Sequence, residues 1–401
     1  MQIGVIAPLY PTRKEPYRGA AIWNTLRALT AHASVSAYCV HPYPKFVYRR
    51  SFRYHDEPVH ALQYGVPAQM VNYFAVPWAT RCWNAHAIHR RLMRTLRDAA
   101  LDLLLCYWIH PEGYAAVRLA RALGIPVVLG ARGSDLAKFH GNPVLRKQIR
   151  LALEQADAVL CVSQDLARRA IALGAAGERV LTIPNGIDRT VFDCHGADAA
   201  REQLRIPSGC RLAVFVGWLS ELKGISQLVQ ALGLLQRRDP GRWRLAVIGE
   251  GYLRSAVQRQ IARLGLNGQV FLLGPKRPAE VADWMKAADV LCLPSETEGC
   301  PNVVLEALSV GTPVLATAVG GVPDLVHDDC GILIQNRQPE EIAQALRSIA
   351  SRRWDRSAIA RTSGRSWDRV ARETYDVCQW VTKKWAMDKP RDGAGLACIT
   401  K

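Results

Sequence analysis

Two carboxylates, Glu298 and Glu306, flank the expected start of a helix in a pattern that suits a polyhydroxyl ligand. The apolar run 288–294 has the length of a buried parallel strand, and Pro301 suits the first position of a helix over Asn302 to Ser309. A helix N-terminus collects free N–H groups and the positive end of the helix dipole, which favour phosphate or hydroxyl groups. Because carboxylates accept hydrogen bonds from neighbouring hydroxyls, the stretch suits a sugar or a ribose.

Glu306 lies about five residues into this helix, or about 7 Å along the axis at about 1.5 Å per residue. The two carboxylates could therefore contact different parts of one elongated ligand. The alternative is that both are solvated surface acids, because the helix dipole favours acids near a helix N-terminus whatever the function.

Lysine, tryptophan and glycine residues follow other strands expected in the second half of the chain. Lys223 lies in the loop GWLSELKG, which begins with Gly217 and Trp218 and turns into a helix. Gly249 belongs to a GEG turn that allows close approach of a backbone, and Lys276 follows the apolar strand FLLG. Cations beside glycine-rich turns suit a diphosphate.

The composition predicts two globular domains, because the chain has 401 residues of which 49% are hydrophobic and 22% are charged. No stretch reaches the roughly 18 apolar residues of a membrane span, and a strand is expected directly from Gln2, so we expect a cytoplasmic protein. Eleven cysteines without a CxxC motif favour buried thiols over disulfides or a zinc site. Cys300 stands at a helix N-terminus, which lowers a thiol's pKa, although an incidental role is the better interpretation.

The net charge of +17 is uneven, with 24 Lys and Arg against 13 Asp and Glu in residues 1–195, and 28 against 22 in residues 196–401. Such an excess favours an anionic lipid surface or a phosphorylated substrate, and no nucleic-acid-binding signature accompanies it. A helix expected over 79–98 combines five arginines with Trp83 and Leu92, as a helix lying on an anionic bilayer would. An ordinary amphipathic helix packed on its sheet explains the pattern equally well.

Strands and helices alternate with short loops along both halves of the chain, which predicts two doubly wound parallel sheets. In the first half we expect strands over 2–8, 34–40, 101–106, 126–130, 158–162 and 180–183, with an irregular stretch at 41–78. A linker at 188–207 precedes strands over 211–216, 245–248, 270–273, 290–293 and 314–316. We therefore expect α/β domains over 1–195 and 196–365, with ligands in a cleft between the carboxyl ends of their strands.

Loops at the carboxyl ends of the first domain's strands are candidates for the other wall of that cleft. The first such loop is rich in proline and basic residues and ends at Gly19, without the GxGxxG pattern of dinucleotide binding. The loop ARGSDLAKF contributes Arg132, Ser134 and Asp135, and His110 follows a strand in YWIHPEG. We expect these residues on the first-domain side of the cleft.

Several segments together resemble the retaining glycosyltransferases of family 4, which have the GT-B fold of two Rossmann-like domains facing across a cleft. They are PSETEGCPNVVLEAL at 294–308, PNGID at 184–188, FVGWLSELKG at 215–224, IGEG at 248–251 and SWDRVARE at 366–373. RGSDL at 132–136 and HPEGYAA at 110–116 resemble the branch that builds bacterial surface polysaccharides. The resemblance covers most of the chain.

The resemblance implies transfer of a hexose from a UDP- or GDP-sugar to a hydroxyl, with retention and without a metal or other cofactor. Glu306 would hold the ribose hydroxyls, Lys223 would neutralise the diphosphate, and Glu298 would hold hydroxyls of the donor sugar. The backbone of Cys300, Pro301, Asn302 and Val303 would cradle sugar and phosphate. The acceptor would be lipid-linked or an oligosaccharide, so the enzyme could be peripheral on the inner face of the plasma membrane.

The chain departs from the family pattern at two places. Trp218 stands where the family usually has an arginine beside the lysine of the phosphate site. The family's first-domain histidine near the reaction centre aligns with Tyr107, so either Tyr107 supplies a hydroxyl donor or His110 takes the role, which its place at a strand end favours. The family also implies a last helix over 366–386 that crosses back to the first domain, before a flexible tail at 387–401.

Two other functions stay open at this point. One is a nucleotide-sugar epimerase of similar fold, which would need additional acid and base residues that the sequence does not identify. The other is a non-catalytic relative that binds a nucleotide-sugar, in which Trp218 and Tyr107 have abolished turnover. Release of nucleoside diphosphate from the donor would separate the transferase from a binding protein.

Overall fold

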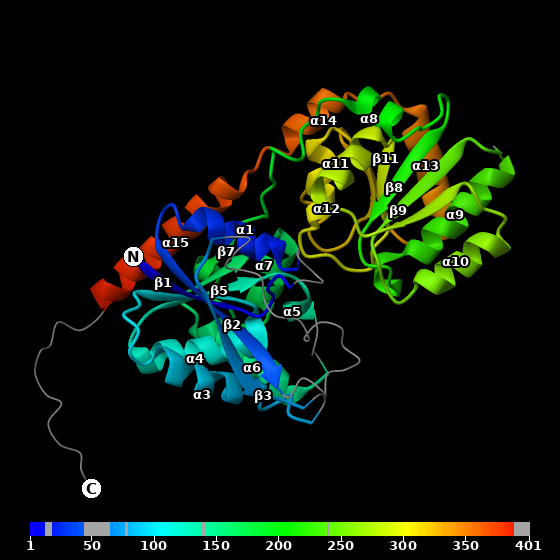
Figure 1. Cartoon of the computed structure of the whole chain (residues 1–401). Helices are drawn as coiled ribbons and strands as arrows, with labels where there is room; N and C mark the ends of the chain where they lie inside the picture. Colours follow the sequence, from blue (N-terminus) through cyan, green and yellow to red (C-terminus); the bar gives the residue numbers. More distant parts are fainter. Residues whose placement is uncertain (13–17, 44–64, 77–78, 138–140, 239, 389–401) are drawn as a thin grey trace, which may run out of the picture.

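The computed structural model describes residues 1–12, 18–43, 65–76, 79–137, 141–238 and 240–388, in which two parallel sheets form two α/β units (Figure 1). The first sheet has the order β3-β2-β1-β4-β5-β6-β7, and the second has the order β10-β9-β8-β11-β12-β13. The chain reverses its direction of travel across the sheet between β1 and β4, and again between β8 and β11. These two switch points are where open parallel sheets bind ligands. The prediction of two doubly wound sheets is confirmed.

The first sheet is covered by helices on both faces. Its strands are β1 Gln2–Ala7, β2 Ser34–Tyr43, β3 Ala68–Phe74, β4 Leu103–Tyr107, β5 Val127–Ala131, β6 Ala158–Cys161 and β7 Val180–Thr182. The helices are α1 Ala20–Leu29, α3 Asn84–Leu96, α4 Tyr114–Leu123, the short α5 Ser134–Ala137, α6 Pro143–Gln155 and α7 Gln164–Ala172.

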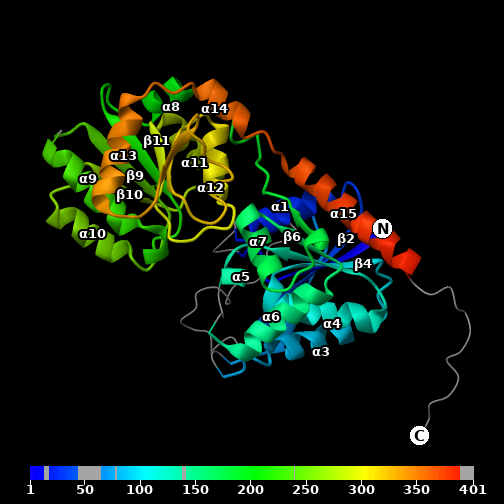
Figure 2. The same ribbon diagram turned by 180° about the vertical axis from the view of Figure 1, so that it is seen from behind.

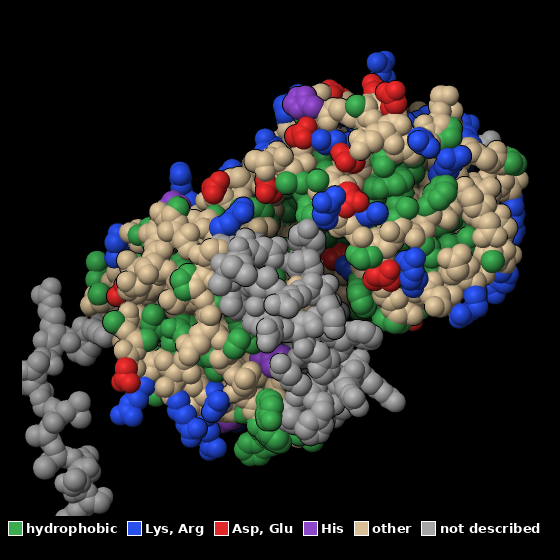
Figure 3. Space-filling view, viewed as in Figure 1, with side chains coloured by type: hydrophobic (Ala, Val, Ile, Leu, Met, Phe, Trp, Pro, Cys, Tyr) green, Lys and Arg blue, Asp and Glu red, His purple; other side chains and the backbone are tan. Residues whose placement is uncertain are grey.

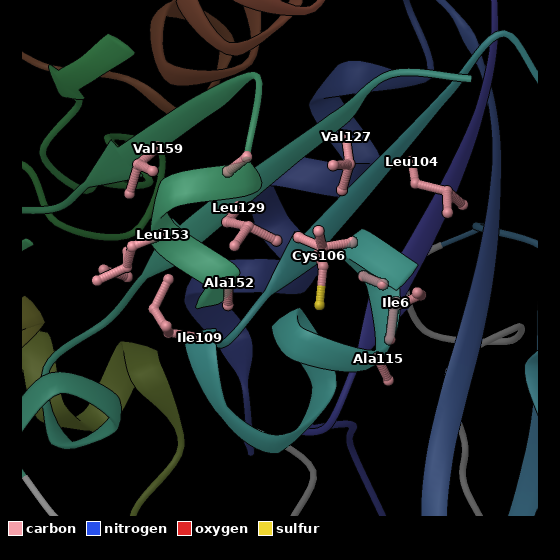
Figure 4. Packing of buried hydrophobic residues seen from close by; sticks show 14 of the residues in the cluster. Ile6, Leu104, Cys106, Ile109, Ala115, Val127, Leu129, Ala152, Leu153 and Val159 are labelled. Carbon is pink, nitrogen blue, oxygen red and sulfur yellow. The ribbon is translucent and has the colours of Figure 1, made fainter. Parts of the chain in front are cut away.

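Side chains of successive residues in these strands alternate between the two faces, so each face has its own core. Leu104 and Cys106 of β4 and Leu129 of β5 point toward the layer of α3, α4, α6 and α7, where Ala152 and Leu153 of α6 pack on them (Figure 4). The alternate residues of β4, including Tyr107, belong to the opposite core, which α1 covers.

The second sheet is built in the same way. Its strands are β8 Arg211–Val216, β9 Trp243–Ile248, β10 Val270–Gly274, β11 Val290–Leu293, β12 Val314–Thr317 and β13 Gly331–Ile334. One face is covered by α9 Ile225–Arg238, α10 Arg254–Arg263 and α13 Pro339–Ser351, and the other by α8 Ala197–Gln203, α11 Pro278–Ala287, α12 Asn302–Ser309 and α14 Arg356–Thr362.

The last helix, α15 Trp367–Asp388, returns from the second sheet and packs along α1 (Figures 1 and 2). Val370, Ala371 and Cys378 of α15 are buried in the core on the α1 side of the first sheet. The chain thus passes between the two sheets twice, and the two passages touch, because the N–H of Ile187 donates to the carbonyl oxygen of Arg365 over 2.9 Å.

Two regular elements occur in stretches that the sequence predicted to be irregular or a linker, and the strand β13 was not predicted either. The edge strand β3 lies in the stretch expected to be irregular, and its alternating buried and exposed residues give it less apolar character than the central strands. Helix α8 lies in the expected linker and has one buried residue, Ala200. Most of the rest of the stretch 41–78, and the tail after Asp388, lie outside the described residues.

The basic helix predicted over 79–98 is α3, which is packed on the sheet. Ala85, Ile88, Leu92 and Leu96 form its buried stripe, whereas Trp83 and the arginines at 90, 91, 94 and 97 are exposed. The apolar stripe is therefore satisfied within the domain, and the exposed side of α3 is basic. Lys and Arg side chains gather along the corresponding lower edge of the molecule in Figure 3.

Candidate active site between the two domains

An ion pair stands at the switch point of the second sheet. Lys223 follows β8 and Glu298 follows β11, and Lys223 Nζ donates to Glu298 Oε1 over 2.5 Å. The two loops are pressed together at Gly224, where a Cβ atom would lie 2.0 Å from the carbonyl oxygen of Pro294. The Glu298 side chain is 9% exposed and that of Lys223 is 28% exposed, so the cation is the more accessible partner. An anionic ligand could compete for it.

The loop of Glu298 is also held from its other side by the glycine-rich turn after β12. Gly320 has φ +55°, and a Cβ atom there would lie 1.8 Å from the carbonyl oxygen of Glu298. Gly321 approaches the carbonyl oxygen of Gly299 equally closely, since a Cβ atom would lie 2.1 Å from it. Only glycines allow this backbone-to-backbone contact, which fixes the loop that carries Glu298.

A pocket of about 380 Å³ lies at the start of α12 and is lined by residues of both domains. The second domain contributes Glu306 and Asn302 from α12 and Lys276 from the loop after β10. The other wall consists of Asn24 and Arg27 of α1, Asp188 of the connection, and Trp367 of α15. The predicted position of ligands between the sheets therefore coincides with a cavity large enough for a nucleoside-sized group.

Glu306 faces this pocket in an environment that opposes its charge. Burial raises the pKa of its carboxyl to about 7. The carboxylate form needs hydrogen-bond donors to compensate for lost hydration, and hydroxyls of a ligand would supply them. Lys276 has its Nζ 3.4 Å from Glu280 Oε1 and remains 30% exposed at the pocket.

Gly217 after β8 and Gly249 after β9 are needed because the backbones of their two loops touch. A Cβ atom on Gly249 would lie 2.0 Å from the carbonyl oxygen of Gly217, so the close approach foreseen for the GEG turn is made by the protein's own loop. Trp218, between these loops and Lys223, is 39% exposed. The Trp218 side chain is thus accessible at the surface.

The helix N-terminus at Cys300 to Val303 is formed as expected, with Pro301 preceding the first residue of α12. The Cys300 thiol agrees with the preferred interpretation of an incidental cysteine, because it is buried in the first domain's core cluster and burial raises its pKa to about 11. Desolvation of a thiolate outweighs the helix dipole here. Cys300 is therefore not an activated thiol.

In the first domain, Arg132 and Asp135 hold the cleft loop in place. Asp135 is fully buried and accepts the N–H groups of Arg132, Gly133 and Ile109, at 2.7 to 3.3 Å. Burial raises the pKa of Asp135, and these N–H groups offset part of that rise. The loop touches the donor side, because a Cβ atom on Gly299 would lie 2.3 Å from the carbonyl oxygen of Arg132. Asp135 therefore shapes the loop rather than facing a ligand.

Sequence reasoning missed Asn185, which connects this loop to the second domain. Its side chain is 5% exposed and accepts a hydrogen bond from Arg132 while donating to Asn302 and to the carbonyl oxygen of Cys300. The signal was its place in PNGID, directly after the last strand of the first sheet and before the passage to the second.

Tyr107 and His110 both point into the first domain. Tyr107 is 2% exposed, its hydroxyl has no hydrogen-bond partner among the described residues, and burial raises its pKa to about 12. It lines a small void with Val370 and Thr374 of α15, on the face that α1 and α15 cover. His110 is 1% exposed and its Nε2 lies 2.7 Å from Gln148 Oε1 of α6, while burial lowers its pKa. The structure brings neither ring to the interdomain pocket.

Two further candidates are peripheral to these contacts. Gly19 adopts a left-handed conformation with φ +70° and precedes α1, whose residues reach the pocket. Ser134 begins the short helix α5, and its side chain lies outside the described atoms. The described residues contain no group of three or more His, Cys, Asp or Glu side chains that could hold a metal ion. All ten described cysteines are free.

Comparison with known proteins identifies the family. The family model of the glycosyl transferases of group 1 matches residues 197–367, and that of glycosyltransferase family 4 matches residues 22–191. A D-inositol 3-phosphate glycosyltransferase of Xylanimonas cellulosilytica is 33% identical over 294 residues, which cover 69% of this chain and 68% of that protein. The chain belongs to the glycosyl transferases of group 1. TuaC of Bacillus subtilis (strain 168), named for teichuronic acid biosynthesis, is 29% identical to this glycosyltransferase over 86% of its chain and 88% of TuaC.

Solved structures share the fold of this glycosyltransferase at lower identity. The crystal structure of Anabaena HepE in complex with UDP and glucose matches it with a TM-score of 0.69 and 18% identity, over 96% of this chain and 99% of HepE. WaaG, a glycosyltransferase involved in lipopolysaccharide biosynthesis, matches with a TM-score of 0.64 and 17% identity, over 96% and 99% of the two chains. These similarities confirm the GT-B fold predicted from the sequence.

Within the described part of the glycosyltransferase, no helix combines the length and the apolar character that crossing a membrane requires.

Proposed function

We propose that this glycosyltransferase moves a hexose from a nucleotide-sugar to a hydroxyl of a lipid-linked or oligosaccharide acceptor, with retention of anomeric configuration and without a metal. The observation that carries the proposal is that the Lys223–Glu298 ion pair follows strands β8 and β11 of the same sheet whose neighbouring strand ends and helix α12 supply Lys276 and Glu306 to the interdomain pocket. A nucleoside diphosphate-sugar has the same sequence of groups: a ribose, a diphosphate and a sugar. The complexes of HepE with UDP and with UDP-glucose support a donor of this class.

Each group of the donor finds a chemically matched partner. The ribose hydroxyls donate to the Glu306 carboxylate, and the diphosphate accepts from Lys223 and from the N–H groups of Asn302 and Val303 at the start of α12. Glu298, released from Lys223 when the phosphate takes that cation, accepts hydroxyls of the sugar. Charge that develops on the departing phosphate is stabilised by the lysine and the helix N-terminus, which are already in position.

Retention follows from a displacement on one face of the sugar. The acceptor hydroxyl attacks the anomeric carbon from the side of the leaving group, the bond from that carbon to the phosphate oxygen breaks, and the departing phosphate takes the hydroxyl's proton. This route needs no protein base at the reacting carbon. It is consistent with the inward orientation of both His110 and Tyr107.

The acceptor class rests on the relatives and on surface charge. TuaC is named for teichuronic acid biosynthesis and WaaG for lipopolysaccharide biosynthesis, so a role in cell-surface polysaccharide synthesis at the inner face of the plasma membrane is the natural proposal. The exposed arginines of α3 would face anionic lipid.

Co-sedimentation of the protein with anionic vesicles tests this docking, and it should decrease when Arg90 and Arg94 are both changed to Glu. The matched α10 pair, Arg259 and Arg263 to Glu, controls for net charge, and equal losses would refute docking by α3.

The decisive experiment screens UDP- and GDP-sugars by thermal shift and then measures release of nucleoside diphosphate. A donor that binds only the folded protein raises its unfolding temperature, and turnover separates a transferase from a binding protein. Glu306→Ala should weaken nucleoside diphosphate binding about 10- to 100-fold, because two charge-assisted hydrogen bonds are lost. Unchanged affinity in this variant would contradict the role of Glu306 as the ribose ligand.

A further inference from the structure

Arg132 and Asn185 form a chain of hydrogen bonds from the first domain to the N-terminus of α12. Arg132 Nη1 donates to Asn185 Oδ1 over 2.7 Å. Asn185 Nδ2 then donates to Asn302 Oδ1 over 2.8 Å and to the carbonyl oxygen of Cys300 over 3.2 Å. The oxygen of the Asn185 amide accepts a hydrogen bond and its nitrogen donates. An aspartate lacks the donor and an aliphatic side chain lacks both groups, so neither can replace it.

The first-domain end of this chain is rigidly held. The guanidinium carbon of Arg132 lies 4.4 Å from the centre of the Tyr107 ring, a cation–π contact in a largely desolvated setting. The Arg132 backbone N–H donates to the buried Asp135. The inward orientation of Tyr107 therefore has a structural role, because its ring packs against the Arg132 guanidinium and holds it in place.

The second-domain end of the chain is the peptide that leads into the donor site. Cys300 follows the loop of Glu298, and Asn302 is the first residue of α12. Because Asn185 bonds the carbonyl oxygen of one residue and the side chain of the other, it fixes both the direction of this peptide and the start of the helix. The contact of Gly299 with the carbonyl oxygen of Arg132 adds a second constraint from the same first-domain loop.

We propose that Arg132 and Asn185 are positioning residues for sugar transfer, which hold the α12 N-terminus and the Glu298 loop in the geometry that the departing phosphate and the sugar require. This inference rests on the proposed function. Glu306 and Lys276 hold the nucleoside without help from these hydrogen bonds, and only part of the diphosphate binding involves the start of α12. Loss of the hydrogen bonds should therefore lower kcat by a larger factor than it weakens nucleoside diphosphate binding. A small misplacement at the reacting atoms is enough for a large loss of rate.

The experiment compares two substitutions with matched controls. In Asn185→Ala the control is Asn142→Ala, since the Asn142 side chain also forms hydrogen bonds at the start of a helix, where it accepts from the backbone N–H groups of Val144 and Leu145 of α6. In Arg132→Gln the control is Arg121→Gln, since Arg121 also stacks on a ring, that of Trp385, and donates to a carbonyl oxygen. The controls lose comparable contacts away from the cleft.

The readouts are kcat for nucleoside diphosphate release from UDP-glucose or GDP-mannose, whichever the wild type cleaves faster, and the Kd of UDP or GDP by calorimetry. Asn185→Ala and Arg132→Gln should each lower kcat about 10- to 100-fold with Kd within about threefold of wild type, whereas the controls keep both values. The double variant should lose little more than either single variant, because both act through one chain. Equal kcat in Asn185→Ala and Asn142→Ala, or fully additive losses, would overturn the inference.

Failure of the proposed function gives a different result. A wild-type protein that neither binds nucleoside diphosphate nor cleaves a nucleotide-sugar would refute the transferase proposal alone. In that case, amide hydrogen exchange in the segment 299–303 still tests whether the hydrogen bonds of Asn185 hold the start of α12. Faster exchange there in Asn185→Ala than in Asn142→Ala supports it, and equal exchange overturns it.

Discussion

The two walls of the cleft are built on the same sheet architecture and use it differently. On the donor side, polar side chains at the switch point face one another, as Lys223 and Glu298 do across 2.5 Å. On the first-domain side, the corresponding polar side chains turn inward, with Tyr107 under Arg132 and His110 against Gln148. The donor wall carries groups that can bind a ligand, whereas the opposite wall uses its polar groups mainly to hold loops.

This difference has a physical origin in how each wall is supported. The donor loops are fixed by backbone contacts at glycines, such as Gly320 against the carbonyl oxygen of Glu298, which leave side chains available. The first-domain loop is fixed by side chains, with Asp135 accepting three backbone N–H groups. A side chain that supports a loop cannot also contact a substrate. Changes on the donor wall should therefore alter ligand chemistry directly, whereas changes on the other wall should act through position or stability.

The largest expected effect is that of Lys223→Ala. Without this cation the charge on the departing phosphate loses its strongest partner, so the rate of nucleoside diphosphate release should fall about 100- to 1,000-fold. The control is Lys286→Ala, which breaks another lysine–carboxylate pair, with Asp193 of the connection at 2.8 Å, near the C-terminal end of α11. Steady-state kinetics would contradict the comparison if the two variants lost activity equally.

The pH dependence of donor binding is the next largest expected effect, and it depends on Glu306. Burial raises the pKa of Glu306 to about 7 from its ordinary value of 4.5, so the carboxyl is protonated in the folded protein at pH 6 and charged at pH 8. Its contribution to folding stability is present below pH 4.5 and is lost as pH rises through 7. Ribose hydroxyls bind the charged form of Glu306 better, so nucleotide affinity should rise as the pH increases from 6 to 8.

Isothermal titration with UDP and GDP between pH 6 and 8 measures this dependence. Glu306→Gln should flatten it, because an amide does not titrate in this range. A pH profile that persists unchanged in Glu306→Gln would assign the dependence to another group. The opposite trends of stability and affinity in the wild type are themselves a test, since a general effect of pH on folding would move both in the same direction.

The sequence predicted the local structure of the second-domain wall well and the side-chain directions of the first-domain wall poorly. Glu298, Glu306 and the start of α12 are close in the chain, so the sequence strand-loop-helix alone places them near one another. The direction of the Tyr107 side chain follows from the alternation of β4, in which Leu103 and Leu105 share its face. The partners of Asn185 at Cys300 and Asn302 are more than 100 residues away, and no local pattern predicts them.

Gly320→Ala should have an intermediate effect, mainly on stability. Both Gly320 and Gly241 have a positive φ, +55° and +77°, so an alanine at either position is strained by about 1–3 kcal/mol. Only at Gly320 would the new Cβ meet a backbone atom, the carbonyl oxygen of Glu298. Gly320→Ala should therefore cost about 1–3 kcal/mol more than Gly241→Ala in urea unfolding, and it should also reduce transfer by displacing Glu298. Equal unfolding free energies would show that the loop accommodates the clash.

The smallest expected effect is that of Tyr107→Phe. The hydroxyl lies in the first domain's core without a hydrogen-bond partner among the described residues, so its removal should change the free energy of unfolding by less than about 1 kcal/mol and could stabilise the protein. The ring would remain under Arg132, so kcat should stay close to that of the wild type. Tyr107→Leu keeps an apolar side chain but removes the ring, and it should lower kcat through Arg132. A large loss of kcat in Tyr107→Phe would mean that the hydroxyl reaches the reacting groups, and that the two walls are more alike than their side-chain directions indicate.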